Sequence, residues 1–246
     1  MTVGAILPAA GRGTRMAPVT EGAPKELIPL GGRTVLDFVL DEALEVAGHV
    51  CVVSAPGKPA VDAHVQHRAS VVHQEVARGF AHAVRLGIQG LPPCDAYIVL
   101  LPDTLFSGGS HGQGLVAGLL ACLEQADVAI AAERVPEDRV HRYGIMETQG
   151  DRIVRIKEKP MPNETSSRLA VGARYAFGAS FADYLERACR EHYALGKSAK
   201  ELSLTPVIGA YLLEGGVGWA MPLDGWHRLD CGDPQGYAEA RQVFGA

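Results

Sequence analysis

The sequence lacks any pair of cysteines spaced as Cys-x-x-Cys, although it contains five cysteines. Five is an odd number, and these residues are scattered along the chain. A disulfide framework and a zinc site are therefore both poorly supported, and a reduced, cytoplasmic setting fits this pattern best.

A long apolar run and an excess of positive charge are also missing. No stretch approaches the roughly 20 apolar residues that span a bilayer, and Met1–Ala10 is apolar without a basic leader. We therefore expect no signal peptide and no membrane segment. Lys and Arg number 23 against 28 Asp and Glu, a formal net charge of −5. Nucleic acid and anionic membranes are not favoured as partners, so an anionic ligand must bind in a local pocket.

Three familiar patterns for nucleotide binding or catalysis are absent. The dinucleotide fingerprint G-x-G-x-x-G would begin at Gly11 and Gly13 but would need glycine in place of Met16. The phosphate loop G-x-x-x-x-G-K-[ST] has no match, and no Ser-His-Asp or Cys-His arrangement is visible. A dinucleotide-dependent dehydrogenase is therefore disfavoured, and we expect no covalent enzyme intermediate.

The 246 residues are 47% hydrophobic and 21% charged, which is typical of a globular protein with a substantial core. Strand and helix signals alternate through the first half and predict parallel βαβ units in a doubly wound sheet. The strands expected there are Val3–Leu7, His49–Ser54, Val71–His73, Ala96–Leu101 and Val128–Ala132. The helices expected there are Val35–Leu44 with Thr34 as its cap, Pro59–Gln66, Ala77–Gln89 and Gly112–Gln125. Between the first strand and the first helix, Ala9–Leu30 is too rich in Gly and Pro for a helix and predicts a long ordered loop.

The second half has a different pattern, with strands that follow one another with little helix between them. The strands expected there are Tyr143–Glu147, Ile153–Ile156, Leu169–Phe177, Trp219–Met221 and Trp226–Leu229, and the helices are Phe181–Glu191, Pro206–Leu213 and Pro234–Phe244. This predicts an α+β extension packed on the same sheet. With no repeats and no linker, we expect one domain, 1–246, with functional halves at about 1–133 and 134–246.

The loop after the first strand carries glycines and cations together. Gly11 and Gly13 allow backbone N–H groups to approach phosphate closely. Arg12, Arg15 and Lys25 add three cations, opposed in the first 25 residues only by Glu21. A simple turn with solvated arginines would explain a lone G-x-G, but the cations and the following Pro-Lys-Glu favour a phosphate-binding loop.

Two further positions bear polar groups suited to a ligand. Gln74 carries an amide with one acceptor and two donors, which matches the edge of uracil or thymine, while Gly79 leaves room for a ring. The alternative for Gln74 is a helix cap, and His82 is interpreted as a packing residue. Asp103 ends a buried strand, where open α/β sheets bind ligands, or else caps a turn. Asp233 precedes proline and predicts a helix N-cap.

The motif G-x-G-T-R-M followed by P-K-E, within Leu7–Leu30, resembles the signature loop of the bacterial sugar-1-phosphate nucleotidyltransferases, most closely the UTP–glucose-1-phosphate uridylyltransferases. The segment from His73 to Ala83 resembles the second motif of that family, and the likeness extends over nearly the whole chain. The resemblance implies a Rossmann-like α/β fold with a mostly parallel mixed sheet and an α+β sugar-binding extension. The nucleotide-binding residues that it implies are Ala9, Ala10, Gly11, Gly13, Thr14, Arg15, Gln74 and Gly79.

The same resemblance implies roles in chemistry. Arg15 would lie on the departing pyrophosphate and Lys25 beside the phosphate that undergoes substitution. Asp103 and Asp230, the latter within a D-x-G element, would hold Mg²⁺. On the sugar side, Tyr143-Gly144 and Glu158-Lys159-Pro160 resemble the sugar-binding elements: Glu158 would accept hydrogen bonds from hydroxyl groups, and Lys159 would neutralise the sugar phosphate.

The implied reaction is transfer of a nucleotidyl group from a nucleoside triphosphate to a sugar 1-phosphate such as glucose 1-phosphate, with UTP preferred and dTTP possible. Relatives are commonly homodimers or homotetramers. The alternatives are another nucleotide, an unusual sugar or cyclitol phosphate, or a non-catalytic nucleotide-sugar sensor. The chain departs from the family at a missing insertion before Gln74, at Arg168 and Ala173 in place of Asn and Gly, and at Thr205-Pro206. Most of these changes are on the sugar side, so the acceptor stays open.

Overall fold

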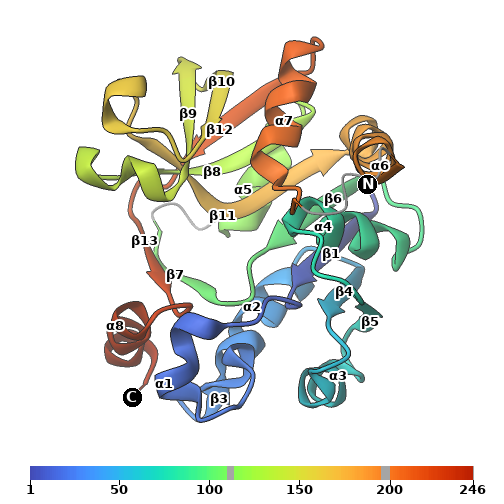
Figure 1. Ribbon diagram of the computed structural model, residues 1–246, viewed down its shortest axis with the longest axis vertical. Coiled ribbons are helices and arrows are strands. Elements are labelled where there is room, and N and C mark those ends of the chain that lie inside the picture. The colour runs from blue at the N-terminus through green and yellow to red at the C-terminus, as the bar shows by residue number, and fades with distance from the viewer. Residues whose placement is uncertain (110–113, 195–199, 246) are drawn as a thin grey trace.

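A nine-stranded mixed sheet runs through the molecule, for which a computed structural model describes residues 1–109, 114–194 and 200–245 (Figure 1). The strands occur in the order β5, β4, β1, β6, β11, β8, β12, β10, β9. Their bounds are β1 Val3–Pro8, β4 His49–Ser54, β5 Ser70–His73, β6 Ala96–Leu100, β8 Val128–Arg134, β9 Gly144–Gln149, β10 Arg152–Glu158, β11 Leu169–Gly178 and β12 Gly218–Pro222. Neighbours from β5 to β6 are parallel, whereas β11 is antiparallel to both β6 and β8, and β9 is antiparallel to β10. The predicted mixed α/β fold is confirmed.

Helices cover both faces of this sheet because its strands are apolar on both sides. Along β1, Ala5 and Leu7 belong to one buried cluster and Ile6 to the other. The first cluster includes residues of α2 (Val35–Leu44), α3 (Pro59–Val65) and α5 (Leu115–Cys122), and the second includes residues of α4 (Phe80–Gln89), α6 (Ala179–Ala194) and α7 (Leu204–Leu213). The alternation of side chains along each strand therefore produces two cores, one on each face.

The predicted caps are both present. Thr34 and Asp37 form a capping box at α2, in which each side chain accepts from the backbone N–H of the other residue. At α8 (Pro234–Phe244), the Asp233 carboxylate accepts from the N–H of Gly236 at 3.0 Å. In Figure 1, α8 lies beside the N-terminal loop region, and the hydroxyl of Tyr237 donates to the carbonyl of Pro29.

Three sequence expectations need correction. The helix predicted from Ala77 begins only at Phe80, because Gly79 has φ 90° and ψ 178°, a conformation outside the helical region. The segment Ala9–Leu30 contains a short α-helix, α1 (Ala17–Thr20), and two 3₁₀ turns at Thr14–Met16 and Lys25–Leu27. A short hairpin forms between β2 (Pro29–Leu30) and β3 (Arg33–Thr34). For the predicted helix Gly112–Gln125, α5 spans Leu115–Cys122, and Gly112 and Gln113 lie outside the described residues.

A second small sheet was not expected. β7 (Thr104–Gly108) pairs in antiparallel fashion with β13 (Trp226–Asp230), so the chain after Asp103 is joined to a segment more than a hundred residues away. This pairing places Asp230 opposite Thr104. Separately, no helix in the described part of the chain is both long and apolar enough to cross a membrane.

Candidate active site

Two adjoining cavities contain most of the candidate residues. The first, here the loop cavity, has a volume of about 560 Å³ and is lined by Ala10, Gly11, Arg12, Lys25, Gln74, Gly79 and Asp103, among others. The second, here the strand cavity, has a volume of about 260 Å³ and is lined by Arg15, Asp103, Gly144, Glu158, Ala173 and Asp230, among others. Asp103 lines both cavities. The structure thus gathers residues from four distant motifs around one carboxylate.

Lys25 forms an ion pair with Asp103, and both side chains are largely buried. Burial by itself would lower the pKa of Lys25, but the charge of Asp103 and the hydrogen bond to it outweigh burial and raise the pKa. Lys25 is therefore a cation at neutral pH. Gly13 contributes to this arrangement: its φ is +65°, and a Cβ there would lie 3.2 Å from Cγ and Cδ of Lys25. A side chain at Gly13 would displace the lysine.

Asp103 and Asp230 converge at Gly232. A Cβ at Gly232 would lie 2.8 Å from a carboxylate oxygen of each aspartate, so glycine leaves the space between them open. Burial and then the charge of Asp103 raise the pKa of Asp230, which shows that the two carboxylates repel each other. No group of three or more His, Cys, Asp or Glu side chains is close enough to hold a metal within 1–109, 114–194 and 200–245. The buried carboxylate of Asp103 and the partly buried carboxylate of Asp230 face this open space. Such a pair suits Mg²⁺, which commonly takes one or two carboxylates plus substrate phosphates.

A buried ion pair between Glu26 and Lys58 holds the N-terminal loop in place. Glu26 is fully buried, and Lys58 donates to both of its carboxylate oxygens at 2.9 Å. Lys58 also donates to the carbonyl of Ala9 at 2.6 Å, while the N–H of Ala9 donates to the carbonyl of Val53 at 2.8 Å. Ala9 is buried and both of its main-chain groups are paired within the protein, so its direct contact with a nucleotide stays a prediction. Thr14 is exposed and does not line either cavity.

Gln74 and Gly79 lie together, but for reasons that the sequence did not reveal. The amide nitrogen of Gln74 is 3.1 Å from the carbonyl oxygen of Gly79 and 3.0 Å from Nδ1 of His82. A Cβ at Gly79 would lie 2.6 Å from the backbone of Leu202. Glycine is therefore required at position 79 by backbone packing and by its positive φ of 90°, beyond any room that it leaves for a ring.

The sugar-side candidates differ in how far they enter the strand cavity. Gly144 and Glu158 line it, and a Cβ at Gly144 would collide with Thr205 at 2.9 Å. Lys159 follows Glu158 in the chain and donates its N–H to the carbonyl of Tyr143, the residue before Gly144, at 2.9 Å. Its side chain is 63% exposed and does not line either cavity. A role for Lys159 on a phosphate thus requires its side chain to turn inward.

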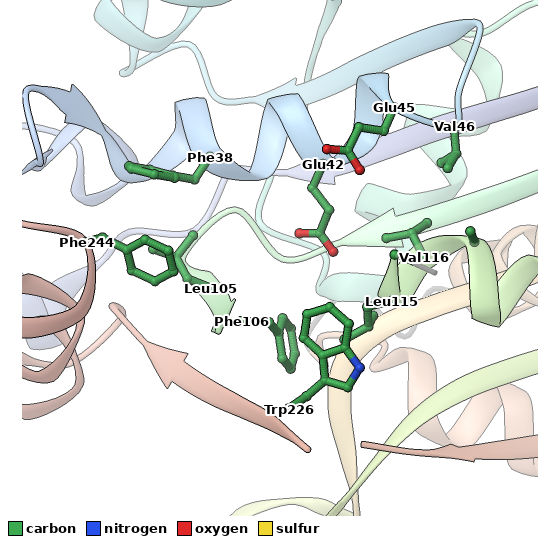
Figure 2. Close-up of a pocket in the computed structure, with 12 residues that line it drawn as sticks. Phe38, Glu42, Glu45, Val46, Leu105, Phe106, Leu115, Val116, Trp226 and Phe244 are labelled. Atoms are coloured by element: carbon green, nitrogen blue, oxygen red, sulfur yellow. The ribbon is translucent and has the colours of Figure 1, made fainter. Parts of the chain in front are cut away.

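A third cavity has the wrong chemistry for polyphosphate. Figure 2 shows Phe106 and Trp226 next to each other beneath α2, which contributes Phe38 and Glu42. Glu45, the residue directly after α2, also lines this cavity. Among the residues that the structure describes, none that lines this cavity of about 340 Å³ carries a basic side chain. Aromatic rings and carboxylates repel an anionic ligand or leave it unpaired, so the loop and strand cavities are the candidate active site.

Comparison with known proteins identifies the family of the chain. The model of the nucleotidyl transferase family matches residues 4–244, nearly the whole chain and all of the motif residues. The chain belongs to the nucleotidyl transferase family. The resemblance seen in the sequence is confirmed.

Two relatives of this nucleotidyl transferase have the same enzyme name, and a solved structure is similar to the chain over nearly its whole length. The UTP–glucose-1-phosphate uridylyltransferase of Haemophilus influenzae is 29% identical, over 98% of this chain and 92% of its own. The enzyme of that name from Pseudomonas aeruginosa is 27% identical, over 96% and 93%. The structure of a UTP-bound UGPase from Acinetobacter baumannii superimposes with a TM-score of 0.79 at 27% identity, over 99% of this chain and 93% of the other.

Two cations of the candidate site were not identified from the sequence, and a third was noted there without a role. Arg142 and Arg228 line the strand cavity, and Arg12, noted only as one cation of the loop, lines the loop cavity. Arg228 donates to Glu133 at 2.5 Å and lies 3.4 Å from the hydroxyl of Tyr143. Arg228 had no sequence signal because it lies on β13, whose pairing with β7 forms only in the fold.

The residues at which the chain departs from the family pattern differ in whether they line a candidate cavity. Ala173 and Thr205 line the strand cavity, so these two departures lie within the candidate site. Arg168 instead forms an exposed ion pair with Glu137 at 2.7 Å and does not line either cavity. The replacement at position 168 therefore has no direct contact with the site.

Proposed function

We propose that this nucleotidyl transferase transfers the uridylyl group of UTP to a sugar 1-phosphate such as glucose 1-phosphate and releases pyrophosphate. The observation that carries the proposal is the position of Asp103, which lines both cavities and forms an ion pair with Lys25. A triphosphate in the loop cavity and a sugar phosphate in the strand cavity would meet beside this pair. The names of the relatives support the same reaction.

The chemistry requires positioning rather than a protein nucleophile. An oxygen of the sugar phosphate attacks the α-phosphorus of UTP, a new P–O bond forms, and the bond from the α-phosphorus to the bridging oxygen breaks as pyrophosphate leaves. Lys25 stabilises the negative charge that develops on the α-phosphate. Arg15 lines the strand cavity, which adjoins the loop cavity at Asp103, and it would stabilise the leaving pyrophosphate from that side. Arg12 and the backbone of Ala10 and Gly11 line the cavity that would hold the triphosphate.

On the acceptor side, Glu158 and Gly144 would contact the sugar, and Lys159 would turn inward to its phosphate. Asp103 and Asp230 would hold Mg²⁺, which supplies positive charge to phosphate oxygens when bound. We further propose a cytoplasmic enzyme that assembles as a homodimer or homotetramer. The same reaction with dTTP is the second candidate, because uracil and thymine present the same edge to Gln74.

The test is pyrophosphate release with a panel of nucleotides and sugar phosphates in the presence of Mg²⁺. We expect the highest rate with UTP. Lys25→Ala and Asp103→Ala should each lower kcat by about 10²-fold or more while the fold persists, as removal of one charge-stabilising group does in other enzymes. Lys157→Ala is the matched control, since Lys157 pairs with Glu147 at 2.8 Å and lines neither cavity. Near-normal rates in either site variant would contradict the assignment, and ligand binding without turnover in the wild type would instead support a sensor.

A further inference from the structure

The side chain of Gln74 is held by two partners within the protein. Gln74 follows β5, is 8% exposed and lines the loop cavity. Its amide nitrogen lies 3.1 Å from the carbonyl oxygen of Gly79 and 3.0 Å from Nδ1 of His82. A carbonyl oxygen only accepts hydrogen bonds, so the amide atom that faces Gly79 must be the nitrogen. The orientation of the amide is thereby determined by its surroundings.

The second amide hydrogen determines the state of His82. It points to Nδ1, which can accept it only when that nitrogen carries no proton, so the ring must be neutral and protonated at Nε2. The surroundings favour the neutral ring: burial, then the charges of Arg78 and Arg85, lower the pKa of His82. The ring is 8% exposed and packs edge-on against Tyr193, with 5.4 Å between the ring centroids.

This arrangement leaves Oε1 as the one hydrogen-bonding group of the Gln74 side chain that has no partner among the described residues. Both amide hydrogens are engaged, and the described residues supply no hydrogen-bond partner for Oε1. Gln74 therefore offers the loop cavity an acceptor alone, rather than the acceptor with two donors that the sequence indicated. If Oε1 faces N3 of the base, it pairs with the N–H that uracil and thymine carry there, whereas N3 of cytosine is itself an acceptor and would oppose it.

We propose that His82 is a positioning residue that orients the Gln74 amide with Oε1 toward the base, and that this sets a preference for UTP or dTTP over CTP. The inference rests on the nucleotidyl transfer proposed above. It assigns a role to a side chain that the sequence pattern indicated only for packing.

Two substitutions separate orientation from packing. His82→Phe keeps a ring against Tyr193 but removes the acceptor, whereas His82→Asn removes the ring but places Oδ1 where Nδ1 was. We expect His82→Phe to raise KM for UTP and to lower the preference for UTP over CTP, each by about tenfold, the effect of one lost buried hydrogen bond. Its kcat at saturation should change little. In His82→Asn, both the KM for UTP and the preference for UTP over CTP should stay near the wild-type values. A purely structural role predicts the opposite order, and that result would overturn the proposal, as would equal base preference in all three proteins.

One measurement needs no substitution and no turnover. Nitrogen NMR of the wild-type protein at neutral pH should show the His82 ring with Nδ1 unprotonated and Nε2 protonated, and the reverse tautomer would overturn the orientation. If the wild-type protein turned over no nucleotide, the proposed function would be contradicted. The NMR measurement of the His82 tautomer would still test the orientation of the Gln74 amide. The two failures are therefore distinguishable.

Discussion

Lys58 binds both carboxylate oxygens of Glu26 at 2.9 Å and so joins the segment after β4 to the segment that carries Lys25. The same ammonium holds the carbonyl of Ala9 at 2.6 Å, at the start of the glycine loop. One buried pair thus connects the two ends of the candidate phosphate-binding segment. The loop is thus held by a cation that lines neither candidate cavity.

Breaking this pair should cost stability as well as activity. Glu26→Gln leaves the Lys58 ammonium buried without its counter-charge, and we expect a loss of about 3–5 kcal/mol in the free energy of unfolding, measured with urea. Glu26→Gln combined with Lys58→Met should recover part of this loss. The control is Glu137→Gln in the exposed Arg168–Glu137 pair, where a loss below about 1 kcal/mol is expected. Equal effects at the two sites would refute a structural role for the buried pair.

Removal of Mg²⁺ with a chelator should abolish turnover. Substitution of two neighbouring aspartates should have different effects on the Mg²⁺ concentration that restores it. Asp230→Asn removes one of the two carboxylates that converge at Gly232, so we expect the half-saturating Mg²⁺ concentration to rise by about tenfold or more. Asp233→Asn, three residues away, also removes a carboxylate but keeps the α8 cap, because Asn caps helices as well as Asp. Its Mg²⁺ dependence should match the wild type. The idea fails if chelation leaves the rate unchanged.

Ala173 adopts a backbone conformation that favours glycine, with φ +64°, at a bulge of β11 beside the strand cavity. Ala173→Gly relieves left-handed strain of about 1–2 kcal/mol against an entropic cost of about 0.5–1 kcal/mol, so the variant should be slightly more stable. Its KM for the sugar phosphate should rise by up to about fourfold for the loss of one methyl contact, with KM for UTP unchanged. Ala176→Gly, in the same buried strand without a positive φ, should lose about 1 kcal/mol.

The capping box at α2 predicts a pH-dependent contribution to stability. Burial alone would raise the pKa of Asp37, but hydrogen bonds from Thr34 and then His64 outweigh it and lower the pKa. A lowered folded-state pKa means that the stabilisation is complete above the ordinary value of 3.8 and is lost as the pH falls through the folded value. Asp37→Ala should therefore cost about 1 kcal/mol at pH 7 and progressively less in acid. The exposed Asp183→Ala is the control, and a pH-independent difference for Asp37→Ala would contradict the linkage.

The strands of the first half were predictable because their signal is local. A buried parallel strand is apolar on both faces, so Val3–Leu7 and Ala96–Leu101 could be placed within a residue or two. The caps at Thr34 and Asp233 were predictable for the same reason, since a cap depends on residues three positions apart. The start of α4 was misplaced because the conformation of Gly79 depends on Leu202, which is distant in sequence.

The amino-acid sequence by itself determined the class of fold, the family and the loop that carries Lys25, because strand and helix periodicity and contiguous motifs depend on neighbouring residues. The tertiary structure alone decided which distant side chains meet: β13 beside β7 brings Asp230 to Asp103. Such meetings depend on register and packing between segments far apart in the chain. No local pattern encodes them, and the chemistry of this site depends on them.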